Sequence, residues 1–225
     1  MRTIAVIARK GGSGKTTVAV NLAIAAYLRG KRTLLADSDP QRSSSTVLRG
    51  RETFGPSVRE TSGPELFSLQ AGAVRAGVEA FFIDTPAGAE DELAHAIVLA
   101  DLSLLVIRPT FLDFAAAIRT AEVLRRLRKP GLIVLNQAPV SRAGAEPPLV
   151  KKAQEALRIM RLPVAPTILR ARAAYQSALE SGRSVEELTG AEQASHEVAK
   201  LWAYVDRLTF GARPSARTEE ERLRA

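Results

Sequence analysis

The chain has 225 residues, of which 46% are hydrophobic and 25% charged, a balance typical of a soluble globular protein and not of a disordered or fibrous one. It contains no cysteine and only two histidines, which excludes disulfides, iron–sulfur clusters and a thiol nucleophile and leaves oxygen atoms to ligate any metal ion. The first residues are too few to form a signal segment before charges intervene, and no apolar run approaches the roughly 18 residues of a membrane span. We therefore expect a cytoplasmic protein that does not span a membrane.

Positive charge is concentrated in one part of the chain. The formal net charge is +8, and residues 119–172 contain twelve Lys or Arg against three acidic residues. Such a concentration attracts polyanions by releasing their counterions, so nucleic acid and an anionic membrane surface are candidate partners. Solvated helix faces give the same pattern, and the charge alone does not separate the two interpretations.

Apolar segments of strand length alternate with longer helical patterns along the chain. Several are continuous runs of Val, Ile and Leu, which is typical of strands buried on both faces of a parallel sheet. The sequence therefore predicts one α/β domain over residues 1–210, with a mostly parallel, twisted sheet of about seven strands and helices on both faces. The expected strands are residues 4–8, 33–36, 66–69, 80–83, 102–107, 132–135 and 164–169, and the expected helices are residues 15–29, 90–99, 114–128, 148–160, 175–181 and 192–208.

Two segments have the composition of irregular structure. Residues 43–64 are rich in Ser, Gly, Thr and Arg, which predicts a surface connection with a short helix near residues 44–48. Residues 211–225 carry a proline and alternating charges with hardly an apolar side chain, which predicts a charged, flexible tail.

A glycine-rich loop lies between the first expected strand and the first expected helix. It contains Lys10, Gly11, Gly12, Ser13, Gly14, Lys15, Thr16 and Thr17. Glycines let the backbone N–H groups wrap phosphates, and the start of the helix adds its partial positive charge. In such a loop Lys15 reaches the β- and γ-phosphates and the Thr16 hydroxyl ligates Mg²⁺. The motif in this context predicts a nucleotide-binding P-loop.

The loop departs from the ordinary form, because Arg9 occupies the position of the first glycine and Lys10 precedes the glycine pair. In this it resembles the deviant Walker A ATPases of the ParA/MinD family. The resemblance implies an ATP- and Mg²⁺-dependent enzyme with weak basal hydrolysis and a homodimer in the ATP state that sandwiches two nucleotides. It also implies that Lys10 reaches the phosphates bound by the partner.

Two further motifs of this family follow at the ends of expected strands. Residues 34–41 read Leu-Leu-Ala-Asp-Ser-Asp-Pro-Gln and match its D-x-D-P-Q motif, where acids at the carboxyl end of a parallel strand lie beside the phosphate loop. The resemblance implies that Asp39 positions the attacking water and that Asp37 supports Mg²⁺, whereas the motif alone is equally typical of a turn. Residues 81–88 resemble a Walker B strand, which implies that Asp84 holds Mg²⁺ and that the region of Gly88 senses the γ-phosphate.

The later part of the chain keeps to the same pattern. Asn136 follows the strand at 132–135, and the resemblance implies that it contacts adenine, although a strand-end asparagine also caps loops. Asp113 is predicted to cap the helix at 114–128. Residues 167–175, running on to Gly182, resemble the family's DNA-contacting segment, which implies Arg170 and Arg172 as DNA contacts. The basic stretch adds weaker candidates: Arg119, Lys129, Lys151 and Lys152.

Several branches of the family fit the sequence poorly. The nitrogenase iron protein needs cysteines, and the tail lacks the Lys-rich amphipathic helix of a membrane-binding MinD. The P-loop strand begins at residue 2, so we expect no preceding helix-turn-helix domain and no sequence-specific repression. The resemblance is therefore strongest to a small ParA-like ATPase. It implies a protein that is nucleoid-associated in the ATP state and binds non-specific double-stranded DNA. It also implies that a ParB-like or adaptor protein stimulates hydrolysis and that the cycle segregates or positions a cargo.

Two alternatives stay open at this point. One is an ATP-dependent dimerisation switch that acts on protein partners without DNA. The other is a P-loop ligase of the dethiobiotin-synthetase type, which shares the fold but needs only a few convergent charges at its substrate pocket. The cargo also stays open, between a plasmid, a chromosome region and a large protein assembly.

Overall fold

A parallel sheet forms the centre of the molecule in the computed structural model, which describes residues 1–88, 90–141 and 145–211. Within these residues the sheet has six strands in the order β3-β2-β4-β1-β5-β6, and neighbouring strands are all parallel. The strands are β1 (Arg2–Ile7), β2 (Thr33–Asp37), β3 (Ser57–Glu60), β4 (Ala80–Asp84), β5 (Leu102–Ile107) and β6 (Gly131–Leu135). Because all strands point the same way, their carboxyl ends share one edge of the sheet.

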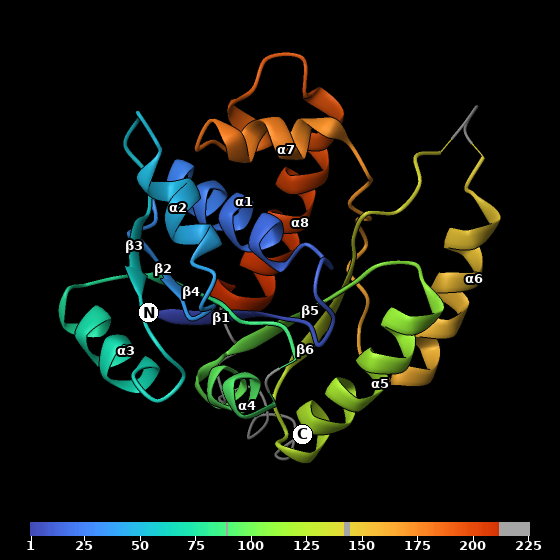
Figure 1. The fold of residues 1–225 in the computed structure, drawn as a ribbon, viewed down its shortest axis with the longest axis horizontal. Helices are drawn as coiled ribbons and strands as arrows, with labels where there is room; N and C mark the ends of the chain where they lie inside the picture. The colour runs from blue at the N-terminus through green and yellow to red at the C-terminus, as the bar shows by residue number, and fades with distance from the viewer. Residues whose placement is uncertain (89, 142–144, 212–225) are drawn as a thin grey trace, which may run out of the picture.

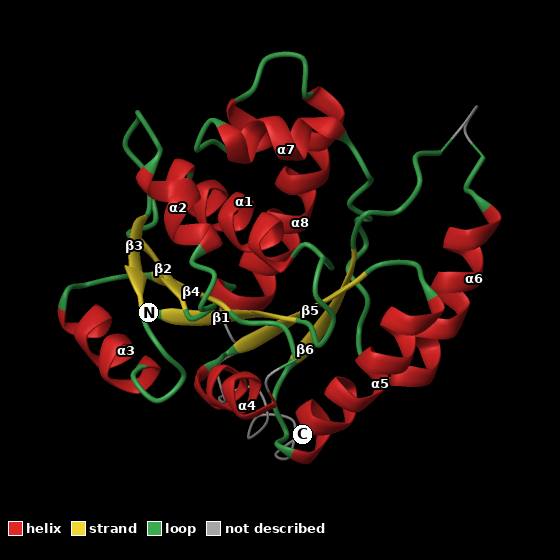
Figure 2. Ribbon diagram, in the orientation of Figure 1, coloured by secondary structure: helices red, strands yellow, loops and turns green. Residues whose placement is uncertain are grey.

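Helices cover both faces of the sheet, as Figures 1 and 2 show. One face carries α1 (Lys15–Leu28), α2 (Ser43–Arg49), α7 (Ala173–Glu180) and α8 (Glu192–Phe210). The other carries α3 (Leu66–Arg75), α4 (Glu90–Leu99) and α5 (Phe111–Arg126), with α6 (Pro148–Leu157) beside α5. Short 3-10 turns, η1 (Arg158–Met160) and η2 (Val185–Glu187), follow α6 and α7.

Each face of the sheet has its own hydrophobic core. Successive side chains of a strand point to opposite faces, so Phe82 packs with α1 and α8 whereas Phe81 and Ile83 pack with α3, α4 and α5. All three are fully buried. The continuous apolar runs in the sequence therefore reflect two cores, and the predicted α/β class with helices on both faces is confirmed.

The predicted strand at residues 66–69 is wrong, because these residues begin helix α3. Within α3 the buried residues are Leu66 and Ala73, a spacing of seven that brings side chains to one face of a helix. Four apolar-rich residues do not distinguish this pattern from a short strand.

The predicted strand at residues 164–169 is also absent, which reduces the sheet from seven strands to six. The segment does run beside β6, where the Ala165 N–H donates to Ile133 O at 2.8 Å and the Leu169 N–H to Leu135 O at 3.0 Å. Only isolated bridges form, at Val164 and Arg170. Pro163 and Pro166 interrupt the pairing, since proline has no N–H to donate.

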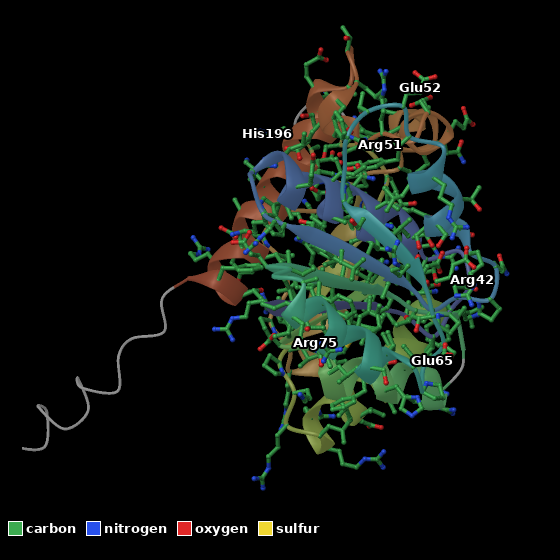
Figure 3. All side chains as sticks on the ribbon, turned by 90° about the vertical axis from the view of Figure 1, so that its left-hand side faces the viewer. Arg42, Arg51, Glu52, Glu65, Arg75 and His196 are labelled. Atoms are coloured by element: carbon green, nitrogen blue, oxygen red, sulfur yellow. The ribbon has the colours of Figure 1, made fainter. Side chains whose placement is uncertain are left out.

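Strand β3 lies inside the segment that the composition predicted to be a surface connection. It is an edge strand of four residues in which only Val58 packs against the core, so it carries little apolar signal. The short helix predicted near residues 44–48 is confirmed as α2. Figure 3 views this edge of the molecule and shows Arg42 and Arg51 flanking α2 at its two ends.

The predicted cap at Asp113 is corrected by the start of α5. The helix begins at Phe111, three residues earlier than expected, and Thr110 is its N-cap, with Oγ1 accepting from the Asp113 N–H at 3.3 Å. Asp113 instead pairs with Arg108, at 3.1 Å from the guanidinium. The predicted tail, apart from Gly211, lies outside the described residues.

Candidate functional site

The P-loop leaves the carboxyl end of β1 and leads directly into α1 (Figure 2). Gly12 and Gly14 have φ angles of 72° and 88°, in the left-handed region that favours glycine. Position 14 also has no room for a side chain, because a Cβ there would collide with Nδ2 of Asn136. The glycines predicted to shape the loop thus have a direct conformational reason to be there.

Thr16 and Asp84 meet at the base of the P-loop. The Thr16 Oγ1 donates to Asp84 Oδ2 at 2.8 Å, while Asp84 Oδ1 is buried and accepts no hydrogen bond from the described residues. A buried carboxylate oxygen without a donor is a natural acceptor for a cation or for water bound to one. The donor set therefore fits Mg²⁺, with Thr16 and Asp84 as the residues that would hold it.

The carboxyl groups of Asp84 and Asp37 lie side by side on neighbouring strands. The two residues are register partners at the ends of β4 and β2, and both are at most 1% exposed. Burial raises the pKa of Asp84 to about 7, the Thr16 hydrogen bond opposes the shift, and the charge of Asp37 adds to it. Two buried carboxyl groups in one place favour a bound cation.

Lys15 supplies positive charge at the same point. It is only 7% exposed at the first position of α1. Burial lowers its pKa, and the negative charges of Asp84 and Asp39 oppose that shift. The contact of Lys15 with phosphate oxygens stays a prediction, and a buried ammonium at the start of a helix, beside a P-loop, is suited to it.

Asp37 and Asp39 have different environments. The two oxygens of Asp37 accept from the N–H groups of Asp39 and Ser45, at 3.2 and 2.8 Å, so this carboxylate shapes the loop that leads to α2. Asp39 is half-buried, and its Oδ1 accepts from the Gln41 N–H at 2.9 Å. Asp39 therefore lies where a carboxylate has access to solvent.

Asn136 and Gln137 hold the P-loop from the end of β6. Nδ2 of Asn136, a buried side chain, donates to Ser13 O at 2.8 Å, and Nε2 of Gln137 donates to Gly12 O at 3.0 Å. The sequence predicted that Asn136 contacts adenine and assigned no role to Gln137. The one signal for Gln137 was its position directly after Asn136 at the end of a strand.

A cavity of about 370 Å³ adjoins the P-loop on this side. It lies between the start of α1, the residues after β6 and the segment that enters α7. Its lining includes Thr17, Asn136, Gln137, Ala171, Tyr175 and Gln176. Since Thr17 and Asn136 border both the P-loop and this cavity, a nucleotide with its phosphates in the loop would have space there for its base.

A model of the CobQ/CobB/MinD/ParA nucleotide-binding domain matches residues 4–204. The chain belongs to this family. It is 32% identical over 212 residues to the maintenance of carboxysome distribution protein A (McdA) of Gloeobacter kilaueensis, covering 92% of this chain and 94% of the relative. The McdA of Halothiobacillus neapolitanus is 29% identical over 198 residues, covering 83% and 87% of the two chains.

Solved structures of ParA/MinD ATPases share the fold. The cell division ATPase MinD of Pyrococcus furiosus superimposes with a TM-score of 0.76 at 21% identity, covering 92% of this chain and 99% of that one. The ATP complex of a Cyanothece McdA variant superimposes with a TM-score of 0.71 at 20% identity, covering 95% of this chain and 97% of that one.

The helices in the described part of the chain include none with the length and apolar character of a membrane span.

In this ParA/MinD ATPase, Lys10 stands at the rim of the P-loop. It is half-buried, and the neighbouring Gly11 and Gly12 are exposed. The outer side of the loop is therefore open to solvent next to a lysine. Gly88, in the segment after β4, has a φ of 78° and lies near the Arg9 carbonyl.

Arg170 and Arg172, the first predicted DNA contacts, are both paired with acids. Arg170 forms a two-pronged ion pair with Glu146 at 2.7 and 2.8 Å and also donates to Pro139 O. Arg172 lies 2.9 Å from Glu197 and also bonds Gln193. Their side chains are only 12% and 21% exposed, and both residues line the 370 Å³ cavity.

The other predicted DNA contacts lie on α5, α6 and the residues between them. Arg119, Lys151 and Lys152 are exposed, whereas Lys129 is half-buried and donates to Ala100 O at 3.3 Å. The two helices lie side by side in Figure 1, and Phe114 of α5 packs against the small core beneath α6. Further exposed cations in this region are Arg125, Arg126, Arg128, Arg158 and Arg161.

Proposed function

We propose that the chain is a ParA-like switch that binds Mg-ATP, dimerises around two nucleotides and binds DNA without sequence preference as a dimer. A ParB-like or adaptor protein then stimulates ATP hydrolysis, which releases the protein from DNA. Repeated binding and release position a cargo. The observation that carries this proposal is the Thr16–Asp84 pair beneath a P-loop that has a second lysine at its rim.

Each residue of the site has a distinct task in the proposed reaction. Lys15 and the loop N–H groups bind the β- and γ-phosphates. Thr16 and Asp84 hold Mg²⁺, which neutralises phosphate charge when bound, and Asp37 supports it while keeping the loop before α2 in place. The half-buried Asp39 orients the attacking water, and Asn136 and Gln137 fix the loop.

The proposed dimer depends on Lys10. Two nucleotides that face each other across a two-fold axis place a large negative charge at the interface, and a lysine from each protomer offsets it with charge-assisted hydrogen bonds. The solvent-open outer side of the loop leaves space for this approach.

A protein assembly is the cargo that the relatives favour. Both McdA relatives are carboxysome distribution proteins that align over most of their length, whereas the chromosome-partitioning ParA of Caulobacter vibrioides aligns over 79 residues, 28% of its length. We propose a large assembly, positioned over the nucleoid by an adaptor protein.

A switch without DNA is the second candidate, because Arg170 and Arg172 are engaged by carboxylates. A DNA phosphate would compete with these carboxylates for either guanidinium. Under the first candidate, the exposed cations of α5 and α6 carry most of the DNA contacts.

Three variants test the nucleotide switch. Lys15→Ala should abolish ATP binding, because it removes the buried charge that faces the phosphates. Asp39→Ala should bind ATP but hydrolyse it far more slowly. In the Asp39→Ala protein with Mg-ATP, light scattering should show a dimer that is lost when Lys10 is also changed to Ala.

Gel shifts with two unrelated duplexes, each with ATP, ADP or no nucleotide, separate the two candidates. Equal binding of both duplexes in ATP alone supports the DNA switch. No binding in any state, with dimerisation intact, supports the protein-only switch. A monomer of Asp39→Ala in Mg-ATP overturns both.

A further inference from the structure

Glu197 of α8 accepts three hydrogen bonds from the segment that borders the 370 Å³ cavity. Its Oε2 accepts from the Arg170 N–H and from the Tyr175 hydroxyl, each at 3.0 Å, and its Oε1 accepts from Nε of Arg172 at 2.9 Å. The Glu197 side chain is only 12% exposed. The three donors span residues 170–175, so one carboxylate holds the whole segment.

The same segment is held on its other side by the loop after β6. The Ala138 N–H donates to Leu169 O at 3.1 Å, and the Ala171 N–H donates to Ala138 O at 2.9 Å. The segment is neither helix nor strand until α7 begins at Ala173, so its position depends on these contacts. Together they define one wall of the 370 Å³ cavity, to which Arg170, Arg172 and Tyr175 all belong.

The charge state of this cluster suits a fixed wall. Burial raises the pKa of Tyr175, and the charge of Glu197 raises it further. The phenol therefore stays protonated and donates at any physiological pH. Hydrogen bonds to an ionised, partly buried carboxylate are stronger than neutral ones, which makes Glu197 an effective anchor.

We propose that Glu197 is a positioning residue for the nucleotide base. Among the described residues, its hydrogen bonds go to Arg170, Arg172 and Tyr175 and not to the P-loop. It fixes residues 170–175 so that the cavity keeps the shape that the base requires. This inference rests on the proposed function, since it assumes that a nucleotide with its phosphates in the P-loop places its base in this cavity.

Equilibrium binding of two ligands tests the inference without reference to hydrolysis. Mg-ATP engages the P-loop and the cavity, whereas Mg-tripolyphosphate engages the P-loop alone. Glu197→Ala should raise the Kd for Mg-ATP about tenfold, as expected for losing charged hydrogen bonds, and leave that for tripolyphosphate unchanged. Glu197→Gln keeps one acceptor oxygen and should cause a smaller rise.

Glu186→Gln is the matched control. Glu186 is also a nearly buried carboxylate, 10% exposed, in a two-pronged pair with Arg29, at 2.7 Å, but it does not line the cavity. It should alter thermal stability and leave both affinities unchanged. Thermal melting of each variant without ligand establishes that it is folded, and Tyr175→Phe, which removes one donor, extends the test if Glu197→Ala unfolds.

The inference and the proposed function fail on different binding results. An unchanged ATP affinity in folded Glu197→Ala and Tyr175→Phe, or an equal loss for both ligands, overturns the inference while the proposed function stands. If the wild-type protein binds neither ligand, the proposed function itself fails.

Discussion

At the scale of single residues, the proposed site divides into side chains to which we assign chemistry and side chains that hold others in place. Lys15, Thr16 and Asp84 are predicted from their motifs, because the tasks proposed for them depend on residue type and spacing. Asn136 and Gln137 act through contacts with Ser13 and Gly12, more than 120 positions earlier in the chain. Only the fold brings such pairs together.

Asn136→Ala should weaken the binding of Mg-ATP and of Mg-tripolyphosphate alike. The change removes a buried hydrogen bond to Ser13 O, worth about 1 kcal/mol, or roughly fivefold in affinity. Gln137→Ala, which removes a more exposed bond to the same loop, serves as the comparison and should have a smaller effect. Isothermal titration calorimetry measures both ligands. A loss confined to ATP would instead support the predicted contact with adenine.

At the scale of elements, strands with two buried faces were the most predictable. The residues of β1, β4, β5 and β6 are nearly all buried, so their composition alone separates them from amphipathic helices. The failures have local physical reasons. Residues 66–69 are too short to show a period, residues 164–169 follow Pro163 and contain Pro166, and β3 is an exposed edge strand.

Contacts between distant elements were beyond the reach of the sequence. Arg51, after α2, is 4% exposed and pairs with Glu187 of η2 at 2.6 Å. It also donates to Gly182 O at 3.0 Å, and a Cβ at Gly182 would lie 2.8 Å from the Arg51 backbone. This contact connects the end of α2 with the end of α7. The two residues are about 130 positions apart in the chain, so no local sequence pattern indicates their contact.

Glu187→Gln should lower the free energy of unfolding at pH 7 by about 3 kcal/mol, because it leaves Arg51 buried without a charged partner. Burial alone would raise the pKa of Glu187, but hydrogen bonds from Arg51 and the Ser184 N–H outweigh it and lower the pKa. A lowered carboxyl pKa stabilises the fold above the unfolded value and loses this effect as pH falls through the folded value.

Chemical denaturation of wild type and Glu187→Gln between pH 7 and pH 3 measures this effect. The difference between the two proteins should be constant near neutrality and shrink as the pH falls below about 4, the ordinary range of a glutamate. The exposed neighbour Glu52 provides the control (Figure 3), since Glu52→Gln should leave stability nearly unchanged. A difference independent of pH would show that the ion pair is not its source.

At the scale of the whole molecule, the positively charged residues fall into two groups. Arg170 and Arg172 form ion pairs beside the cavity, whereas the cations of α5 and α6 are exposed to solvent. The sequence located the charge correctly within residues 119–172 but did not separate these two groups, because the acids that pair with the arginines, Glu146 and Glu197, are 24 and 25 positions away in the chain. The exposed group is the larger, and the proposed dimer would double it and so raise the affinity for a continuous polyanion.

DNA affinity should therefore depend mainly on α5 and α6. In the Asp39→Ala protein held in Mg-ATP, Lys151→Gln with Lys152→Gln should weaken binding on every duplex. It should also flatten the slope of log affinity against log salt by about 0.9 for each DNA phosphate that the protein no longer neutralises.

Arg172→Gln should have its larger effect on ATP affinity, because it disturbs the wall held by Glu197. Arg75→Gln is the matched control: this exposed cation on α3 lies at the far end of the molecule from α6 (Figures 1 and 3), and its loss should leave the slope unchanged. Fluorescence anisotropy at several salt concentrations measures the slopes. A flattened slope for Arg172→Gln at saturating ATP, with none for the lysine pair, would place the DNA on Arg172 instead.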